Sequence, residues 1–303
     1  MLMEGFHILF MRKNNNIWKK IIFTLSVLLS LCGCDRTKNV LYQLSNQSYS
    51  QMMSYIIHYN NKTIVIDGGT AEDEPYLMGQ IEQISGNDTV DAWLITHYHK
   101  DHTGALATYL STNDTRVKIN KVYYHFPEEN WVEINEINRF EDIKAINAQI
   151  NKVDTQIVEA GDNIEIGDID IQVLRSYNES ITMNAGNNSS SVYKVMVNDI
   201  SILFLGDLGV EGGQELLMNK EDDIKNMDYV QMAHHGQAGV NEDVYQVINP
   251  KYCLWPTPDW LWENKDKIYK TDETKNWMKK LNVKKHYIAK DGLISIPLYK
   301  EDD

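Results

Sequence analysis

The sequence is short of positive charge. Its 303 residues contain 29 lysines and arginines against 43 aspartates and glutamates, so the formal net charge is −14. A protein that owes its affinity to the phosphate backbone of nucleic acid is normally basic, because its lysines and arginines neutralise phosphates and release counterions. The charge balance therefore argues against tight binding to nucleic acid.

No apolar run in the sequence is long enough to span a bilayer comfortably. The run "IIFTLSVLLSLC" follows four basic residues and runs into "LCGC", which is typical of a secretory signal. Residues Leu31–Cys34 also resemble the bacterial lipobox, and that resemblance implies cleavage before Cys34 and a lipid on its sulfur. We therefore predict a lipoprotein signal peptide at 1–34 and a tether at 35–50; the alternative is an uncleaved anchor. Either arrangement places the bulk of the protein outside the cytoplasm, anchored to the cell membrane.

Cysteine is scarce as well, with three residues in the chain, Cys32, Cys34 and Cys253. After the predicted processing Cys32 is removed and Cys34 carries the lipid, so Cys253 remains alone. No internal disulfide is then possible, and nothing suggests a metal cluster built on thiolates. The same processing removes four basic residues and one acidic residue, which leaves 25 basic and 42 acidic residues and a formal charge of −17.

The rest of the chain has the composition of a globular domain, since 43% of its residues are hydrophobic. "YIIHYNNKTIVIDGG" predicts a hairpin with Asn60 and Asn61 in the turn. Apolar residues recur at helical spacing from Ile137 to Ile150, which predicts a helix with one buried face. Strands and helices then alternate to the end without internal repeats. This pattern favours one layered α/β domain at residues 51–303.

The strongest signal is "LITHYHKDHTGA", which directly follows a short apolar strand pattern. Alternate residues of a strand point the same way, so His97 and His99 can share one target. A turn after them would let Asp101 and His102 point at a second target nearby. Imidazole and carboxylate groups suit zinc and similar divalent ions, and buried histidines need a partner to compensate their desolvation. The spacing therefore predicts a metal site.

The motif His-x-His-x-Asp-His is the signature of the metallo-β-lactamase superfamily, which the sequence resembles from about Tyr55 to Pro297. "TIVIDGG" resembles the family's first strand and its aspartate, "ILFLGDLG" the element with a metal-bridging aspartate, and "DYVQMAHHGQAG" the element with the last metal histidine. The nearest likeness is to the hydrolase domain of late-competence DNA-uptake proteins and their secreted relatives, through "NNSSSV", "GDL", "HHG" and "KDGLISI". The resemblance implies an α/β fold, a four-layer αββα sandwich of the metallo-β-lactamase type.

The resemblance also implies roles for individual residues. Asp207 would bridge two metal ions. Asp67 would lie beneath the loop that carries the histidine motif and would orient one of the metal ligands. Of the two histidines in "AHHG", we predict that His234 binds metal and that His235 faces the substrate or supports a ligand, although the pattern leaves their order open. The implied metal ligands are His97, His99, Asp101, His102, Asp207 and His234. The implied catalytic residues are Asp101, Asp67 and His235.

One departure from the family pattern concerns the loop before "SVYKVMV". Many members carry a further metal histidine there, whereas this sequence has Asn187, Asn188 and Ser189, and the late-competence branch shares the absence. Asn187 is either a weak oxygen ligand, a hydrogen-bonding partner of the substrate, or part of a plain polar loop. The first metal site would then be held by His97, His99 and Asp207, with water completing it, and its ion would exchange more easily. Zinc is the favoured metal and manganese the alternative.

Two ions bridged by a carboxylate form a clamp for hydrolysis, in which a metal-bound hydroxide attacks. The resemblance implies phosphoester chemistry, and the acidic charge favours a small extracellular or cell-wall-linked phosphodiester over nucleic acid. Trp255, Trp260 and Trp262 would either cap an apolar or quaternary-ammonium group or pack over the edge of the core. The alternatives are a two-metal hydrolase of amide, thioester or lactone bonds and a metal-binding surface lipoprotein without catalysis.

Overall fold

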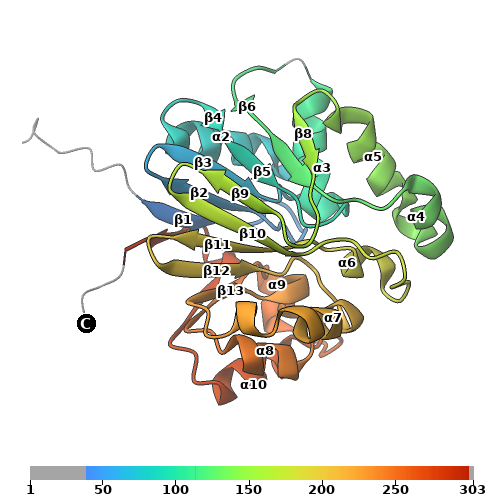
Figure 1. Ribbon diagram of the computed structural model, residues 1–303, viewed down its shortest axis with the longest axis vertical. Coiled ribbons are helices and arrows are strands. Elements are labelled where there is room, and N and C mark those ends of the chain that lie inside the picture. Colours follow the sequence, from blue (N-terminus) through green and yellow to red (C-terminus); the bar gives the residue numbers. More distant parts are fainter. Residues whose placement is uncertain (1–38, 113, 300–303) are drawn as a thin grey trace, which may run out of the picture. The chain divides into compact units, whose positions relative to one another are not determined.

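The computed structural model describes residues 39–112 and 114–299 (Figure 1). Its strands form two seven-stranded sheets and one short pair. The first sheet has the order β16 (Ile294–Pro297), β1 (Val40–Gln43), β2 (Tyr55–Tyr59), β3 (Lys62–Ile66), β5 (Ala92–Leu94), β7 (Val122–Tyr124) and β8 (Thr155–Ile157). The second has the order β15 (Lys285–Ile288), β14 (Tyr252–Trp255), β13 (Tyr229–Gln231), β12 (Ile200–Phe204), β11 (Val192–Val197), β10 (Ile169–Arg175) and β9 (Asn163–Ile166). The pair consists of β4 (Thr89–Val90) and β6 (Lys118–Ile119).

Helices cover the outer faces of the two sheets (Figure 1). Those on the first sheet are α2 (Glu74–Ser85), α3 (Lys100–Ser111), α4 (Glu129–Asn135) and α5 (Phe140–Ile150). Those on the second are α7 (Val210–Lys220), α8 (Glu242–Ile248), α9 (Asp259–Glu263) and α10 (Thr271–Lys280). One more short helix, α6 (Ala185–Asn188), lies in the connection between β10 and β11.

The alternation of side chains in the strands explains the layers. In β2, Tyr55 and Ile57 belong to the core between the two sheets, whereas Ile56 packs on the helix side. In β3, Ile64 lies in the core between the sheets and Val65 on the helix side. Because successive strand residues point to opposite faces, a sheet that is covered on both faces needs apolar residues at every position. The fold is therefore the expected α/β sandwich, with helices outside two packed sheets.

Local predictions succeeded where the turn chemistry is explicit and were less accurate at a helix start. Asn60 and Asn61 connect β2 to β3 with φ values of 47° and 61°, as the hairpin prediction requires. The isoleucine helix begins only at Phe140, and Ile137 lies before it in a 3₁₀ turn with 63% of its surface exposed. The predicted buried face therefore starts one turn later than the periodicity suggested.

The expected tether needs a correction. Val40–Gln43 form strand β1, which pairs antiparallel with both β2 and β16, so the folded unit begins near Asn39 rather than at residue 51. The predicted signal peptide at 1–34 and the lipidation of Cys34 lie outside the described residues. Within the part of the chain that the structure describes, no helix combines the length and apolar character needed to cross a membrane.

Candidate metal centre

The site is assembled from loops that leave the carboxyl ends of four strands. Asp67 follows β3, the histidine motif follows β5, Asp207 follows β12, and His235 follows β13. Strands β3 and β5 are parallel, as are β12 and β13, so within each sheet the two loops leave at the same edge. A backbone hydrogen bond from Ser191 N to Thr96 O links the loops of the two sheets at 2.8 Å. Residues distant in the sequence therefore meet at one edge of the sandwich.

The histidine motif spans the start of a helix. His97 and His99 lie on the extended approach, and α3 begins at Lys100, directly after them. Asp101 and His102 therefore lie on the first turn of α3, which is the turn that the sequence led us to expect. That this turn continues as a helix of 12 residues was not predicted.

Asp67 holds the metal loop from beneath, as the resemblance implied. Its side chain is fully buried and accepts hydrogen bonds from Thr96 N and Thr96 Oγ1, both at 2.8 Å. The same carboxylate lies 2.8 Å from His102 Nδ1. One nitrogen of the His102 ring is thus fixed by Asp67, and the other is directed toward Asp207.

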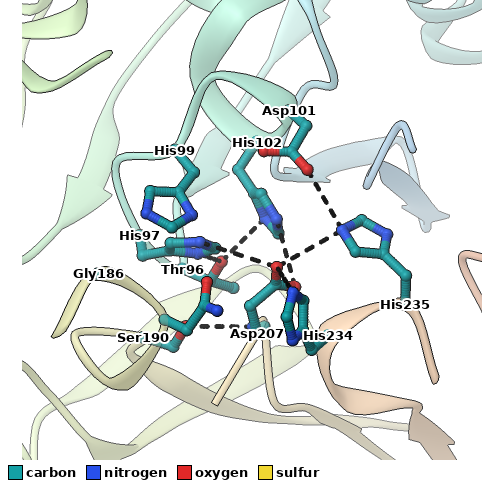
Figure 2. A network of polar contacts seen from close by, with 12 residues as sticks. Thr96, His97, His99, Asp101, His102, Gly186, Ser190, Asp207, His234 and His235 are labelled. Carbon is teal, nitrogen blue, oxygen red and sulfur yellow. Dashed lines mark hydrogen bonds and ion pairs between the residues drawn. The ribbon is translucent and has the colours of Figure 1, made fainter. Parts of the chain in front are cut away.

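Four side chains place one ligand atom each in a small volume, namely Asp101, His102, Asp207 and His235, and these atoms all lie within 4.8 Å of one another. His102 Nε2 is 3.3 Å from Asp207 Oδ1, and His235 Nε2 is 3.5 Å from Asp207 Oδ2 and 3.4 Å from Asp101 Oδ2. Figure 2 shows these imidazoles gathered around the Asp207 carboxylate. The geometry is that of a candidate site for one divalent cation.

His97 approaches the same carboxylate from another side, and His99 packs beside His97. His97 Nε2 lies 4.0 Å from Asp207 Oδ2, and the ring centroids of His97 and His99 are 4.5 Å apart. His99 also contacts a residue that the sequence analysis did not single out, because its Nε2 lies 3.1 Å from Glu136 Oε2. Glu136 is 37 positions along the chain from His99, and no local pattern connects the two.

The donor set fits the metal ions that the fold family implies. Among the described residues, four buried atoms of this cluster lack a hydrogen-bond partner: His97 Nε2, His102 Nε2, His235 Nε2 and Asp207 Oδ1. A buried polar atom without a partner costs about 1–3 kcal/mol, so four of them in one place need compensation. Imidazole nitrogens and carboxylate oxygens are the usual ligands of zinc and similar ions. Divalent cations would provide that compensation.

The pKa values reflect the same crowding of buried charged groups. Burial, with help from the neighbouring imidazoles, lowers the pKa of His97 well below its usual range. Burial alone would also lower the pKa of His102, but the carboxylates of Asp207 and Asp67 raise it well above that range. For His235, Asp207 and Asp101 likewise outweigh burial and raise the pKa to about 9. His102 and His235 therefore carry protons at neutral pH when no cation competes for them.

The geometry reverses the expected order of the two adjacent histidines. We predicted His234 as the ligand, but His235 is the one with a fully buried side chain directed at Asp101 and Asp207. His234 Nε2 lies 3.8 Å from Asp207 Oδ2, its side chain is 21% exposed, and its Nδ1 is 3.2 Å from the Ala238 carbonyl. Both residues have positive φ values, so the backbone turns sharply here and carries His235 inward. We therefore assign His235 to the ligand group and place His234 at its rim.

Asn187 has a hydrogen-bonded amide nitrogen and a buried amide oxygen without a partner among the described residues. Its amide nitrogen donates to Asn184 at 2.9 Å, whereas its Oδ1 is buried without a hydrogen-bond partner in the described residues. The preceding residue, Gly186, packs directly against the His99 ring. Asn187 therefore lies in the loop that borders the His99 side of the centre.

Two of the three tryptophans pack against each other, and the third lies apart from them. Trp255 is fully buried, and Trp262 packs against it with ring centroids 5.2 Å apart. Trp260 is separate from that pair and stacks on the exposed Tyr49, with centroids 5.5 Å apart. Core packing therefore accounts for Trp255 and Trp262.

Comparisons with known proteins agree with this arrangement. A family model described as the metallo-beta-lactamase superfamily matches residues 50–246. No curated protein is matched by the sequence. Among solved structures, the metallo-beta-lactamase fold protein YhfI from Bacillus subtilis is similar with a TM-score of 0.52 and 13% identity, over 85% of this chain and 99% of YhfI. The diiron β-hydroxylase CmlA from Streptomyces venezuelae has a TM-score of 0.55 and 11% identity, over 86% of this chain and 54% of CmlA.

At these low identities the two solved structures support the fold alone. The family match is broader evidence, since it spans more than half of the chain and includes Asp67, the histidine motif, Asp207 and His235. The chain therefore belongs to the metallo-β-lactamase superfamily, most of whose members are metal-dependent hydrolases.

Proposed function

We propose that the protein is a phosphodiesterase that works with two divalent cations. The observation that carries this proposal is the position of Asp207, whose carboxylate lies within 4.0 Å of four imidazoles, those of His97, His102, His234 and His235. A carboxylate shared between two sets of ligands is the arrangement that two-metal phosphatases and nucleases use to clamp a substrate.

The residues divide naturally into two ligand sets around Asp207. His97 and His99 would hold one cation, and Asp101, His102 and His235 would hold the other. When bound, such cations acidify a water molecule and take up negative charge on the group under attack. The chain's own contribution is to fix the ligands: Asp67 holds His102 at 2.8 Å, and the Pro256 carbonyl lies 2.9 Å from His235 Nδ1.

The charge of the site favours an anionic substrate. Two divalent cations would outweigh the two ligand carboxylates, Asp101 and Asp207, and would make this edge a positive point on an acidic protein. The negative charge of a phosphodiester would be attracted to this positive site, whereas a neutral amide or lactone would be attracted less. The likeness of the "NNSSSV", "GDL", "HHG" and "KDGLISI" blocks to late-competence proteins also supports phosphoester chemistry.

The surrounding charge argues for a small substrate. Long nucleic acid would have to approach a chain with 43 acidic and 29 basic residues, and phosphate-backbone affinity needs the opposite balance. A small extracellular or cell-wall-linked phosphodiester meets less repulsion. Zinc is the metal that we propose, with manganese as the alternative.

Metal analysis and a substrate panel on the purified full chain test this proposal. The panel contains bis-(p-nitrophenyl) phosphate, single-stranded DNA, nitrocefin and a thioester, each assayed with the wild type, Asp101→Ala and the exposed control Asp266→Ala. We expect bound divalent metal and turnover of the diester that Asp101→Ala loses and Asp266→Ala keeps. Turnover of nitrocefin or the thioester without the diester would favour the amide, thioester or lactone hydrolase instead. No metal and no turnover would leave a non-catalytic surface protein.

We also infer that the protein is anchored outside the cytoplasm through Cys34. The inference depends on the sequence "LCGC" after an apolar run, and these residues lie outside the described part of the chain. Metabolic labelling with palmitate in a bacterial host should mark the wild type and not Cys34→Ser. Equal labelling of both proteins would exclude lipidation at this residue.

A further inference from the structure

The Glu136 carboxylate forms a bridge between two residues of the histidine motif. Its Oε2 accepts a hydrogen bond from Tyr98 OH at 2.6 Å and lies 3.1 Å from His99 Nε2. Glu136 directly follows α4, and only 16% of its side chain is exposed. A carboxylate that is largely buried against an imidazole is a common device for orienting a metal-binding histidine.

The three other histidines assigned as ligands, His97, His102 and His235, follow a shared rule. In each of these three Nδ1 lies next to a neighbouring oxygen, and Nε2 is buried without a hydrogen-bond partner. The partners are Thr96 Oγ1 for His97 at 3.1 Å, Asp67 for His102 at 2.8 Å and the Pro256 carbonyl for His235 at 2.9 Å. One nitrogen is thus held by the protein, and the other is left to bind a cation.

His99 reverses that rule. Its Nε2 is the nitrogen held by the protein, through Glu136, and no described residue hydrogen-bonds to its Nδ1. A carboxylate accepts hydrogen bonds and cannot donate them when ionised, so the proton between the two groups belongs to His99 Nε2. The nitrogen with a free lone pair is then Nδ1.

We infer that Glu136 is a positioning residue that holds His99 in the Nε2–H tautomer, so that Nδ1 would be the nitrogen offered to the cation of the His97 and His99 set. The inference rests on the two-cation site of the proposed function and adds a residue to it. Glu136 acts through His99 and does not itself touch the substrate. It reaches the centre from the helical layer, on the side where the sequence lacks the further histidine of many family members.

Gly186 provides the space for this contact. A Cβ atom at Gly186 would overlap both Glu136 Oε2 and His99 Nε2, and would also collide with Tyr98 OH. Only glycine lets α6 pack over the carboxylate and the imidazole while they stay in contact. Figure 2 includes Gly186 with the residues of the centre, although it is not a ligand.

The first test measures the tautomer without any substitution at Glu136. Two-bond ¹H–¹⁵N spectra of the ¹⁵N-histidine-labelled full chain distinguish Nδ1–H from Nε2–H imidazoles, and His99→Gln identifies the His99 signal. We expect the Nε2–H form for His99 in the wild type. An Nδ1–H form would overturn the inference, because His99 would then bind through the nitrogen that faces Glu136.

The second test measures zinc affinity by competition with a chelator, which does not depend on catalytic activity. Glu136→Ala should weaken one of the two cation sites by about 10–100-fold and leave the other unchanged, as expected when the outer partner of a ligand is lost. Glu136→Gln should lose less affinity, because its amide oxygen can still accept from His99. The matched control is Glu133→Ala, which removes an exposed carboxylate from α4, the helix that Glu136 follows, and should change neither constant.

The outcomes separate this inference from the proposed function. Two cations bound by Glu136→Ala with wild-type affinities would overturn the role of Glu136 and leave the two-cation site intact. A wild-type chain that binds no cation would remove the proposed function as well. Thermal unfolding of the metal-free variants shows whether a variant that loses zinc affinity is still folded. If Glu136→Ala is unfolded, the zinc affinity of Glu136→Gln and the histidine spectrum of the wild type test the inference instead.

Discussion

His102 Nδ1 lies 2.8 Å from Asp67 Oδ2, and neither side chain is exposed to solvent. Asp67 also receives two hydrogen bonds from Thr96, so its position is fixed from three directions. The His102 ring therefore cannot turn, and its Nε2 stays 3.3 Å from Asp207 Oδ1. Asp67, which is not one of the proposed ligands, thus sets the direction of the nitrogen through which His102 would bind a cation.

Replacing Asp67 should separate metal affinity from folding. Asp67→Asn keeps the shape of the side chain and tolerates the positive φ of 54°, but it loses the charge opposite His102. We expect zinc affinity to fall by about 10–100-fold while the protein still folds. Asp67→Ala leaves the groups around it unpaired and should cost about 3–5 kcal/mol of unfolding free energy. Chelator competition and urea unfolding measure the two effects, and equal zinc affinity in Asp67→Asn and the wild type would contradict the role of Asp67.

Asp207 and Asp101 should differ in the number of cations that each variant loses. Asp207 lies near the imidazoles of both ligand sets, whereas Asp101 lies 3.4 Å from His235 and belongs to one set. Asp207→Ala should bind no cation tightly, and Asp101→Ala should retain one. Elemental analysis of the purified chains counts the ions. One retained ion in Asp207→Ala would show that this carboxylate is not shared.

The two adjacent histidines provide a matched pair of variants. His235 is fully buried and lies within 3.5 Å of two ligand carboxylates, whereas His234 is 21% exposed and 3.8 Å from Asp207. His235→Ala should lose the cation of its set and the diester turnover, and His234→Ala should keep both cations. The reverse result, with metal lost only in His234→Ala, would restore the order that the sequence suggested.

Cation binding should release protons at neutral pH. In the metal-free protein, burial lowers the pKa of His235 but Asp207 and Asp101 raise it to about 9, so the ring is protonated below that pH. A cation binds the neutral ring, so apparent affinity should rise as pH increases toward 9, by about tenfold per pH unit for each proton released. The pKa of His97 is lowered by burial, so that ring has no proton to release near pH 7.

Calorimetry in buffers with different ionisation enthalpies counts the protons released at pH 7. We expect at least one, and His235→Ala should release fewer than the wild type. Zinc affinity that stays constant from pH 6 to pH 9 would contradict the raised pKa of His235.

Sequence patterns were reliable where one short segment contains all the information. The hairpin at Asn60 and Asn61 was predictable because asparagine tolerates positive φ, and its two strands pair with each other. Strand β1 was not predictable, because its partners are β2 and β16, and the latter lies near the other end of the chain. A four-residue strand becomes recognisable only when distant strands enclose it.

The sequence by itself determined the kind of site and most of its members. His97, His99, Asp101 and His102 lie within six residues of one another, which indicated a metal site, and the motif also identified the family. Asp67 and Asp207 were recognisable because "TIVIDGG" and "ILFLGDLG" resemble the elements of that family that carry these aspartates.

Only the tertiary structure decided which side chains turn inward. His234 and His235 are neighbours of the same type, and the choice between them depends on two successive residues with positive φ, which no local pattern specifies. Glu136 belongs to no motif that the sequence analysis recognised. It reaches His99 because α4 and α6 fold over the carboxyl end of β5. Side-chain direction depends on the backbone angles and on long-range packing, and both are properties of the folded chain rather than of a segment.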